Sequence, residues 1–92
     1  MDTPRSDLSA CFADQLRAER AAKRMSRAEL SSASGLSAKT IQRLEDNDRE
    51  MNTDQLARLC RALEVSLVDF VRRAEERMSR PKDDVADVTH TG

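Results

Sequence analysis

The chain has 92 residues, enough for one domain but too few for two, because each half would be too small to hold a core. Hydrophobic residues make up 38% of the sequence and aromatic residues only 2%, so the core must consist of aliphatic side chains, as in a small helical domain. The sequence contains no run of about 18 apolar residues, the length needed to cross a membrane. Two cysteines without a secretory signal exclude a disulfide scaffold, so we expect a compact, all-α, cytoplasmic protein.

The net charge of −1 conceals an uneven distribution of charged residues. Residues 15–43 carry seven Lys or Arg against two acids, whereas residues 44–92 carry eight bases against twelve acids. A basic segment beside an acidic one favours a polyanionic partner for one face of the domain. Chance clustering of charges on a solvated surface accounts for the pattern equally well, so charge alone does not choose between these two interpretations.

The spacing of apolar residues predicts five helices. Phe12 and Leu16 share one face of the first helix, at about residues 9–24. Further helices are expected at about residues 27–33 and 38–46, from Thr53 past Leu63, and at about residues 67–79. The residues of these later helices that are expected to face the core are Leu30, Ala33, Ile41, Leu44, Leu56, Leu59, Cys60, Leu63, Leu67, Phe70, Val71, Ala74 and Met78.

Capping residues mark where these helices begin and end. Ser26 and Glu29 are expected to form a capping box, in which each side chain accepts a hydrogen bond from the backbone amide of the other residue. Gly35 lies just past the end of the second helix, where a left-handed residue is needed. In the loop after the third helix, Asn47 is the residue best able to adopt a positive φ. The residues expected to cap the third, fourth and fifth helices are Ser37, Thr53 and Ser66.

The helices define one domain with a short flexible segment before it and a tail after it. We expect residues 1–8 to be flexible, residues 9–79 to form the domain, and residues 80–92 to be disordered, because the tail is polar and has no apolar period.

Residues 27–46 contain two short helices joined by a tight turn, the arrangement of a helix-turn-helix. Because Ile41 and Leu44 face the core, the second of these helices presents its opposite, polar stripe to solvent. This stripe consists of Ala38, Lys39, Gln42 and Arg43. Arg and Lys can donate to guanine, Gln can pair with adenine, and an Ala methyl can contact a thymine methyl. We therefore predict that these four residues read DNA bases.

Other residues are predicted to hold the DNA backbone rather than the bases. Arg27 opens the second helix, beside backbone amides that have no partner within the helix, and this is a natural place for a phosphate. Arg49 is the single base among the acids of the loop that follows the third helix. The predicted phosphate contacts are Arg27, Ser37, Thr40 and Arg49.

The segment 25–45, MSRAELSSASGLSAKTIQRLE, resembles the helix-turn-helix of the phage repressor and Cro-like group, also called the xenobiotic-response-element (XRE) family. The similarity extends in register from Phe12 to Leu67 and includes all five helices. It implies a lambda-repressor-like domain that binds duplex DNA sequence-specifically as a homodimer and regulates transcription, as a repressor acting on an inverted-repeat operator. It also implies base-reading roles for Ala38, Lys39 and Arg43, and a structural ion pair between Arg20 and Glu45.

The sequence departs from the family pattern at several positions of the helix-turn-helix and the loop after it. Arg27 stands where the family usually has a Gln that contacts phosphate, and Ser31 where it has a small Ala. Asn47 replaces the usual Gly, Asp48 a common base, and Met51 a common Pro. Acids in a loop that lies near the DNA backbone should weaken non-specific affinity, because each lost phosphate contact removes part of the salt-dependent free energy of binding.

The fifth helix carries more apolar residues than one packing seam requires, and this surplus is the basis for predicting a dimer. The residues predicted at the dimer interface are Val68, Phe70, Val71 and Ala74. The alternative is that they all fold back into the core of the monomer. A protein-interaction module, such as an antitoxin that binds a toxin, is the rival functional interpretation, and it is favoured by the same apolar surplus and by the acidic loop.

Nothing in the sequence indicates an enzyme. No nucleophile has a base beside it, and no glycine-rich phosphate loop or carboxylate pair is evident. Cys11 and Cys60 are expected to be small buried hydrophobic residues. Together with His90 in the tail they are too few for a zinc site, so no metal and no cofactor are expected.

Overall fold

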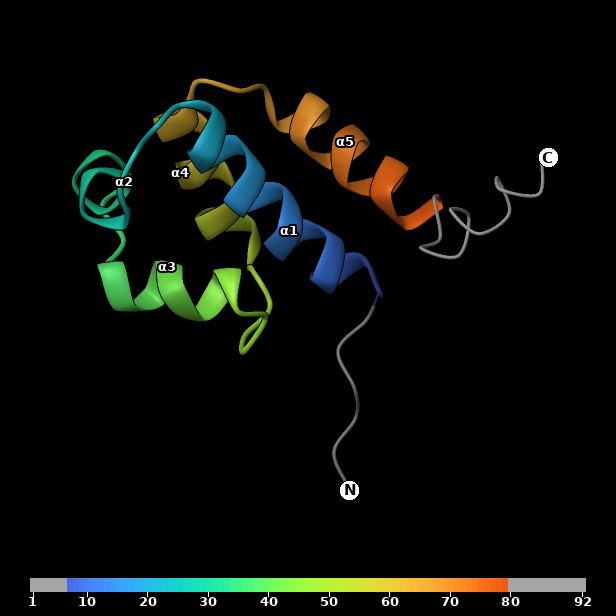
Figure 1. Ribbon diagram of the computed structural model, residues 1–92, viewed down its shortest axis with the longest axis horizontal. Helices are drawn as coiled ribbons and strands as arrows, with labels where there is room; N and C mark the ends of the chain where they lie inside the picture. Colours follow the sequence, from blue (N-terminus) through green and yellow to red (C-terminus); the bar gives the residue numbers. More distant parts are fainter. Residues whose placement is uncertain (1–6, 80–92) are drawn as a thin grey trace, which may run out of the picture.

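A computed structural model describes residues 7–79, and these residues form five α-helices without a β-strand (Figure 1). The helices are α1 (Asp7–Ala22), α2 (Arg27–Ser34), α3 (Ala38–Glu45), α4 (Thr53–Leu63) and α5 (Leu67–Ser79). Helix α5 packs on α1 and α4, while α3 packs on α1 and α2. The predicted all-α class is therefore confirmed. None of the helices within the described range is long and apolar enough to cross a membrane.

A single aliphatic core lies where the inner faces of the five helices meet. Its buried members are Leu16, Leu30, Ile41, Leu44, Leu56, Leu59, Cys60, Leu63 and Phe70. The rings of Phe12 and Phe70 pack against each other, with centroids 5.8 Å apart, and join α1 to α5. Burying each Leu, Ile or Phe side chain contributes about 2 kcal/mol, so the core holds the outer faces of α2 and α3 at fixed angles.

The predicted turns of the helix-turn-helix are present. Ser26 and Glu29 form the expected capping box, and Gly35 has a φ of 81° at the end of α2. A Cβ at Gly35 would lie 3.2 Å from Nη1 at the end of the exposed Arg58 side chain, so the positive φ is the stronger reason for glycine there. Asn47 has a φ of 59°, as predicted for the loop after α3. The turn between the two short helices therefore follows from its glycine and its caps.

Several predicted boundaries and burials are wrong by one or two positions. Helix α1 begins at Asp7, so residues 7 and 8 belong to it, and it ends at Ala22 because Arg24 adopts a left-handed φ of 55°. Asn52 rather than Thr53 caps α4, since its side chain accepts from the amide of Gln55 in a complete capping box. Ala33 is exposed, and the neighbouring Ser34 is buried in its place. The predicted disordered tail, residues 80–92, lies outside the described residues.

Candidate nucleic-acid interface

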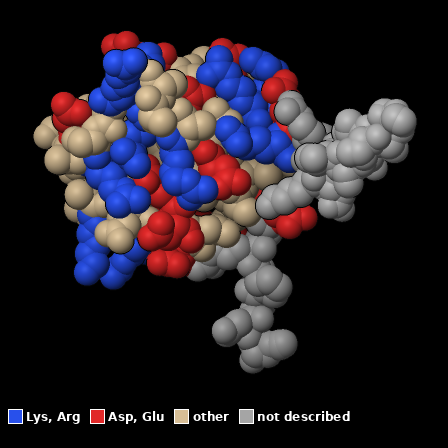
Figure 2. All heavy atoms as spheres, in the orientation of Figure 1, with Lys and Arg blue, Asp and Glu red and all other residues tan. Residues whose placement is uncertain are grey.

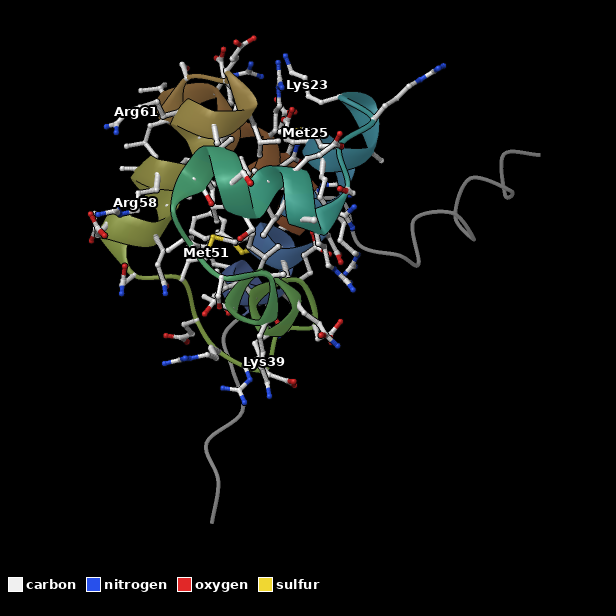
Figure 3. All side chains as sticks on the ribbon, turned by 90° about the vertical axis from the view of Figure 1, so that its left-hand side faces the viewer. Lys23, Met25, Lys39, Met51, Arg58 and Arg61 are labelled. Carbon is white, nitrogen blue, oxygen red and sulfur yellow. The ribbon has the colours of Figure 1, made fainter. Side chains whose placement is uncertain are left out.

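The outer face of α3 presents one polar stripe to solvent. Ile41 and Leu44 are 0% and 1% exposed on the inner face. The four predicted base-reading residues, Ala38, Lys39, Gln42 and Arg43, are all exposed. Viewed along α3 in Figure 3, Lys39 projects away from the body of the domain. Figure 1 shows α3 along the lower edge of the domain, away from α5. The major groove of DNA is wide enough to admit an α-helix.

Two predicted phosphate contacts are hydrogen-bonded to each other at the start of α3. Ser37 is the N-cap, and its Oγ accepts from the backbone amide of Thr40 at 3.0 Å. The same hydroxyl donates to Oγ1 of Thr40 at 2.9 Å. The first turn of α3 is thereby fixed, and both hydroxyls lie at the helix end where its dipole favours an anion.

Glu45, the last residue of α3, is a buried carboxylate that binds two guanidinium groups. It is 0% exposed. Arg20 of α1 donates from Nε at 2.7 Å and from Nη2 at 3.0 Å, one bond to each carboxylate oxygen. Arg27 of α2 donates from Nε at 3.0 Å. Arg17 donates to the backbone carbonyl of Glu45. The predicted pair of Arg20 and Glu45 is confirmed, and the structure adds Arg27, which ties the start of α2 to the end of α3.

This environment controls the ionisation of Glu45. Burial by itself would raise its pKa, but the hydrogen bonds and charges of Arg20 and Arg27 outweigh burial and hold the pKa below the ordinary value of 4.5. A carboxyl group whose pKa is depressed on folding stabilises the fold above its unfolded pKa, and this stabilisation is lost as the pH falls through the folded pKa.

Acid should therefore weaken the fold through Glu45. We expect the free energy of unfolding, measured by urea titration, to fall as the pH is lowered from 5 to 3. Glu45→Gln removes the titrating group, so the difference in stability between the wild-type protein and this variant should shrink over the same range. A difference that stays constant between pH 7 and pH 3 would contradict the depressed pKa.

The loop after α3 contains the remaining predicted phosphate contact. Arg49 is exposed there, next to the exposed acids Asp48 and Glu50. Ser9 of α1 donates to Oδ1 of Asn47 at 2.8 Å and ties the loop to the start of α1. Figure 2 shows basic and acidic side chains interleaved over this face rather than one uniformly basic field. The basic residues of α3 and of the loop that follows it are Lys39, Arg43 and Arg49, and all three are exposed.

The predicted dimer residues divide into two groups. Phe70 and Ala74 are 0% exposed, so the prediction that they form an interface is wrong for these two, because they pack into the core of the same chain. Val68 is 74% exposed and Val71 is half-buried. Leu67 and Met78, which were expected to face the core, are exposed as well, so that expectation is wrong for these two. The apolar α5 face, as we define it, consists of Leu67, Val68, Val71 and Met78.

Comparison with protein families assigns this fold to a known class. The family model described as a Cro/C1-type HTH DNA-binding domain matches residues 15–76. The chain belongs to this family. The resemblance seen in the sequence is thereby confirmed, and the protein is a DNA-binding helix-turn-helix regulator in which α2 and α3 form the motif. A search of curated proteins found no match.

Solved structures of similar proteins agree with membership in the Cro/C1-type family. The clp gene regulator ClgR from Corynebacterium glutamicum is 31% identical, with a TM-score of 0.79, and the match covers 92% of this chain and 93% of that one. The restriction-modification controller protein C.Esp1396I is 25% identical, with a TM-score of 0.78 and coverages of 84% and 100%. The controller protein C.AhdI from Aeromonas hydrophila is 26% identical, with a TM-score of 0.65 and coverages of 67% and 94%.

Two polar features of this Cro/C1-type domain were not predicted from the sequence. The first is the ion pair of Arg27, which was expected to face phosphate only. The second is a network in which the buried Gln15 and Glu19 accept hydrogen bonds from the more exposed Arg77 and Arg73. The sequence does contain a signal for the second, because Glu19 follows Phe12 and Leu16 on the apolar stripe of α1. A charged residue on such a stripe needs a buried partner.

Proposed function

We propose that this Cro/C1-type protein is a repressor that binds an inverted-repeat operator as a homodimer, with one copy of α3 in the major groove of each half-site. The observation that carries the proposal is the exposed stripe of α3. Within residues 7–79, the side chains of Lys39, Gln42 and Arg43 make no hydrogen bond or ion pair. Their donors and acceptors are therefore available to base edges.

Phosphate contacts at both ends of α3 would orient it in the groove. Ser37 and Thr40 lie at its start and Arg49 follows its end. Arg27 lies beside its end, because it is hydrogen-bonded to Glu45, the last residue of α3. The side chain of Arg27 is 39% exposed and uses Nε for Glu45, so its remaining nitrogens can donate to a phosphate. Backbone contacts of this kind fix the register of the protein on DNA, while α3 reads the sequence.

The apolar α5 face supports the homodimer. Leu67, Val68, Val71 and Met78 lie beside the buried Phe70 and Ala74 on α5, and Val68, which is 74% exposed, is the farthest of them from the core. Pairing this face with that of a second copy would bury it in a symmetric interface. A dimer would place two α3 helices about 34 Å apart, one turn of DNA. The roles of similar proteins as a gene regulator and as controllers fit a repressor that blocks a promoter by occupying it.

Binding-site selection tests this function. Purified protein is incubated with random duplex DNA, bound fragments are sequenced, and the enriched site is titrated at two salt concentrations. An inverted repeat with half-sites about one turn apart is the expected result. Failure to enrich any sequence, with binding that disappears at physiological salt, would overturn the proposal. A toxin or other protein would then be the partner of the apolar α5 face.

Arg27→Ala is expected to weaken binding to the operator and to random DNA alike, because its contact is to a phosphate. The slope of log K against log salt concentration should become shallower by about 1. Arg20 keeps both oxygens of Glu45, so the fold should persist, and thermal unfolding of the variant checks this. A loss confined to the operator would mean that Arg27 reads a base.

A further inference from the structure

Four polar side chains join α1 to α5 in a continuous chain of hydrogen bonds, which we call the α1–α5 clamp. Arg77 donates from Nε to Oε1 of Gln15 at 2.7 Å, and Nε2 of Gln15 donates to Oε2 of Glu19 at 2.7 Å. Arg73 donates from Nη1 to the same glutamate oxygen at 2.7 Å. Gln15 and Glu19 are only 6% and 7% exposed. Figure 1 shows α1 and α5 side by side, and Figure 2 shows basic side chains gathered on this side of the molecule.

The clamp fixes α5 in a way that apolar packing alone does not. Phe70 and Ala74 pack into the core and hold α5 against it. Apolar burial is non-directional, however, so it tolerates small translations and rotations of the helix. Gln15 and Glu19 are four residues apart on α1, and Arg73 and Arg77 are four apart on α5. The two helices are therefore joined at two points that are one helical turn apart on each helix. Two such points fix both the position of α5 along α1 and the rotation of α5 about its own axis.

Helix α1 transmits this geometry to the DNA-reading helix. Its Gln15 and Glu19 hold α5, while Arg20 binds both carboxylate oxygens of Glu45 at the end of α3. Arg17 adds a bond to the carbonyl of the same glutamate. Polar contacts thus connect α5 through α1 to α3, and the apolar α5 face has a fixed position relative to the base-reading stripe.

We infer that the α1–α5 clamp sets the spacing of the two half-sites that the protein accepts. The inference rests on the proposed homodimer through the apolar α5 face. In that dimer, the slide and tilt of α5 in each copy determine the distance and angle between the two α3 helices. One base pair of DNA corresponds to about 3.4 Å along the axis and about 35° of rotation. A rigid clamp therefore selects one spacing, whereas a loosened α5 accepts neighbouring spacings.

The test compares an Arg73→Ala/Arg77→Ala variant with an Arg72→Ala control. Arg72 is an exposed arginine of the same helix, but its partners Asp69 and Glu76 both lie on α5, so its loss leaves the clamp intact. Affinity is titrated on the selected operator and on versions with one base pair inserted between or deleted from the half-sites. Sedimentation measures dimerisation. Titration against a single half-site measures the affinity of one α3 helix for its bases, independently of the spacing between half-sites.

We expect the wild-type protein and the control to lose about tenfold or more in affinity when the spacing changes by one base pair, because either the DNA or the dimer must distort. The clamp variant should lose less than about threefold while its single half-site affinity stays within about twofold of wild type. If the double variant does not fold, Arg77→Ala alone carries the test, since it removes only the contact to Gln15, and its spacing preference should also broaden.

The outcomes separate this inference from the proposed function. A wild-type protein that binds its site but has no spacing preference would overturn the homodimer. A wild-type protein with a sharp preference that the folded clamp variant shares would overturn the role of the clamp and leave the homodimer standing. Equal broadening in the Arg72→Ala control would show that charge on α5, rather than the clamp, controls spacing, and this too would overturn the inference.

Discussion

Replacing Arg20 with alanine is expected to lower the free energy of unfolding by about 3 kcal/mol, the lower end of the range for breaking a buried ion pair. The side chain of Glu45 is 0% exposed and receives two of its three side-chain bonds from Arg20. After the substitution, the carboxylate would keep only the single bond from Arg27. Urea denaturation at pH 7 measures the loss, because the protein is small enough for two-state analysis.

A matched variant separates the lost ion pair from lost packing. Arg17→Ala also removes an arginine of α1 that contacts Glu45, but it donates only to the backbone carbonyl of Glu45, and its other partner is the half-exposed carboxylate of Asp14, a surface pair that contributes little. We expect this control to cost about 1 kcal/mol, the net value of one hydrogen bond. Similar losses in the two variants would show that the buried carboxylate is not what makes Arg20 important.

The helix-turn-helix was predictable because its determinants are local in sequence. Ser26, Glu29 and Gly35 fix the ends of α2 through backbone geometry that any chain must obey. Ile41 and Leu44 then determine which side of α3 faces outward, and so the exposed stripe could be identified before the structure was known. The pair of Arg20 and Glu45 came from the family resemblance rather than from spacing.

The packing of α5 was less predictable because it depends on contacts distant in sequence. An apolar surplus on a helix does not say which residues face the core, and Phe70 and Ala74 proved to be buried in the same chain. Arg73 and Arg77 looked like ordinary surface charges, since their partners Gln15 and Glu19 lie more than fifty positions away. The predicted cap of α4, Thr53, differs from the observed cap, Asn52, by one position, which is the usual uncertainty of helix ends.

Arg43→Ala is expected to weaken binding to the selected operator by about 1–3 kcal/mol and to relax the preference at one base pair in each half-site. Arg43 is exposed on the last turn of α3, one turn after Lys39, where a guanidinium can donate two bonds to the N7 and O6 atoms of a guanine. Titration of the variant against the operator, single-base variants of it and random DNA gives both the loss and the base concerned.

The informative comparison is with an arginine of equal charge on another face. Arg61 is exposed on α4, and Figure 3 shows it on the far side of α2 from Lys39 of α3. Arg61→Ala should therefore change affinity for every sequence slightly and equally, through long-range charge alone. Equal losses on operator and random DNA for Arg43→Ala would assign Arg43 to the phosphate backbone, and base reading would then fall to Ala38, Lys39 and Gln42. A loss specific to one base pair, absent in Arg61→Ala, would establish that the exposed stripe of α3 reads the operator directly.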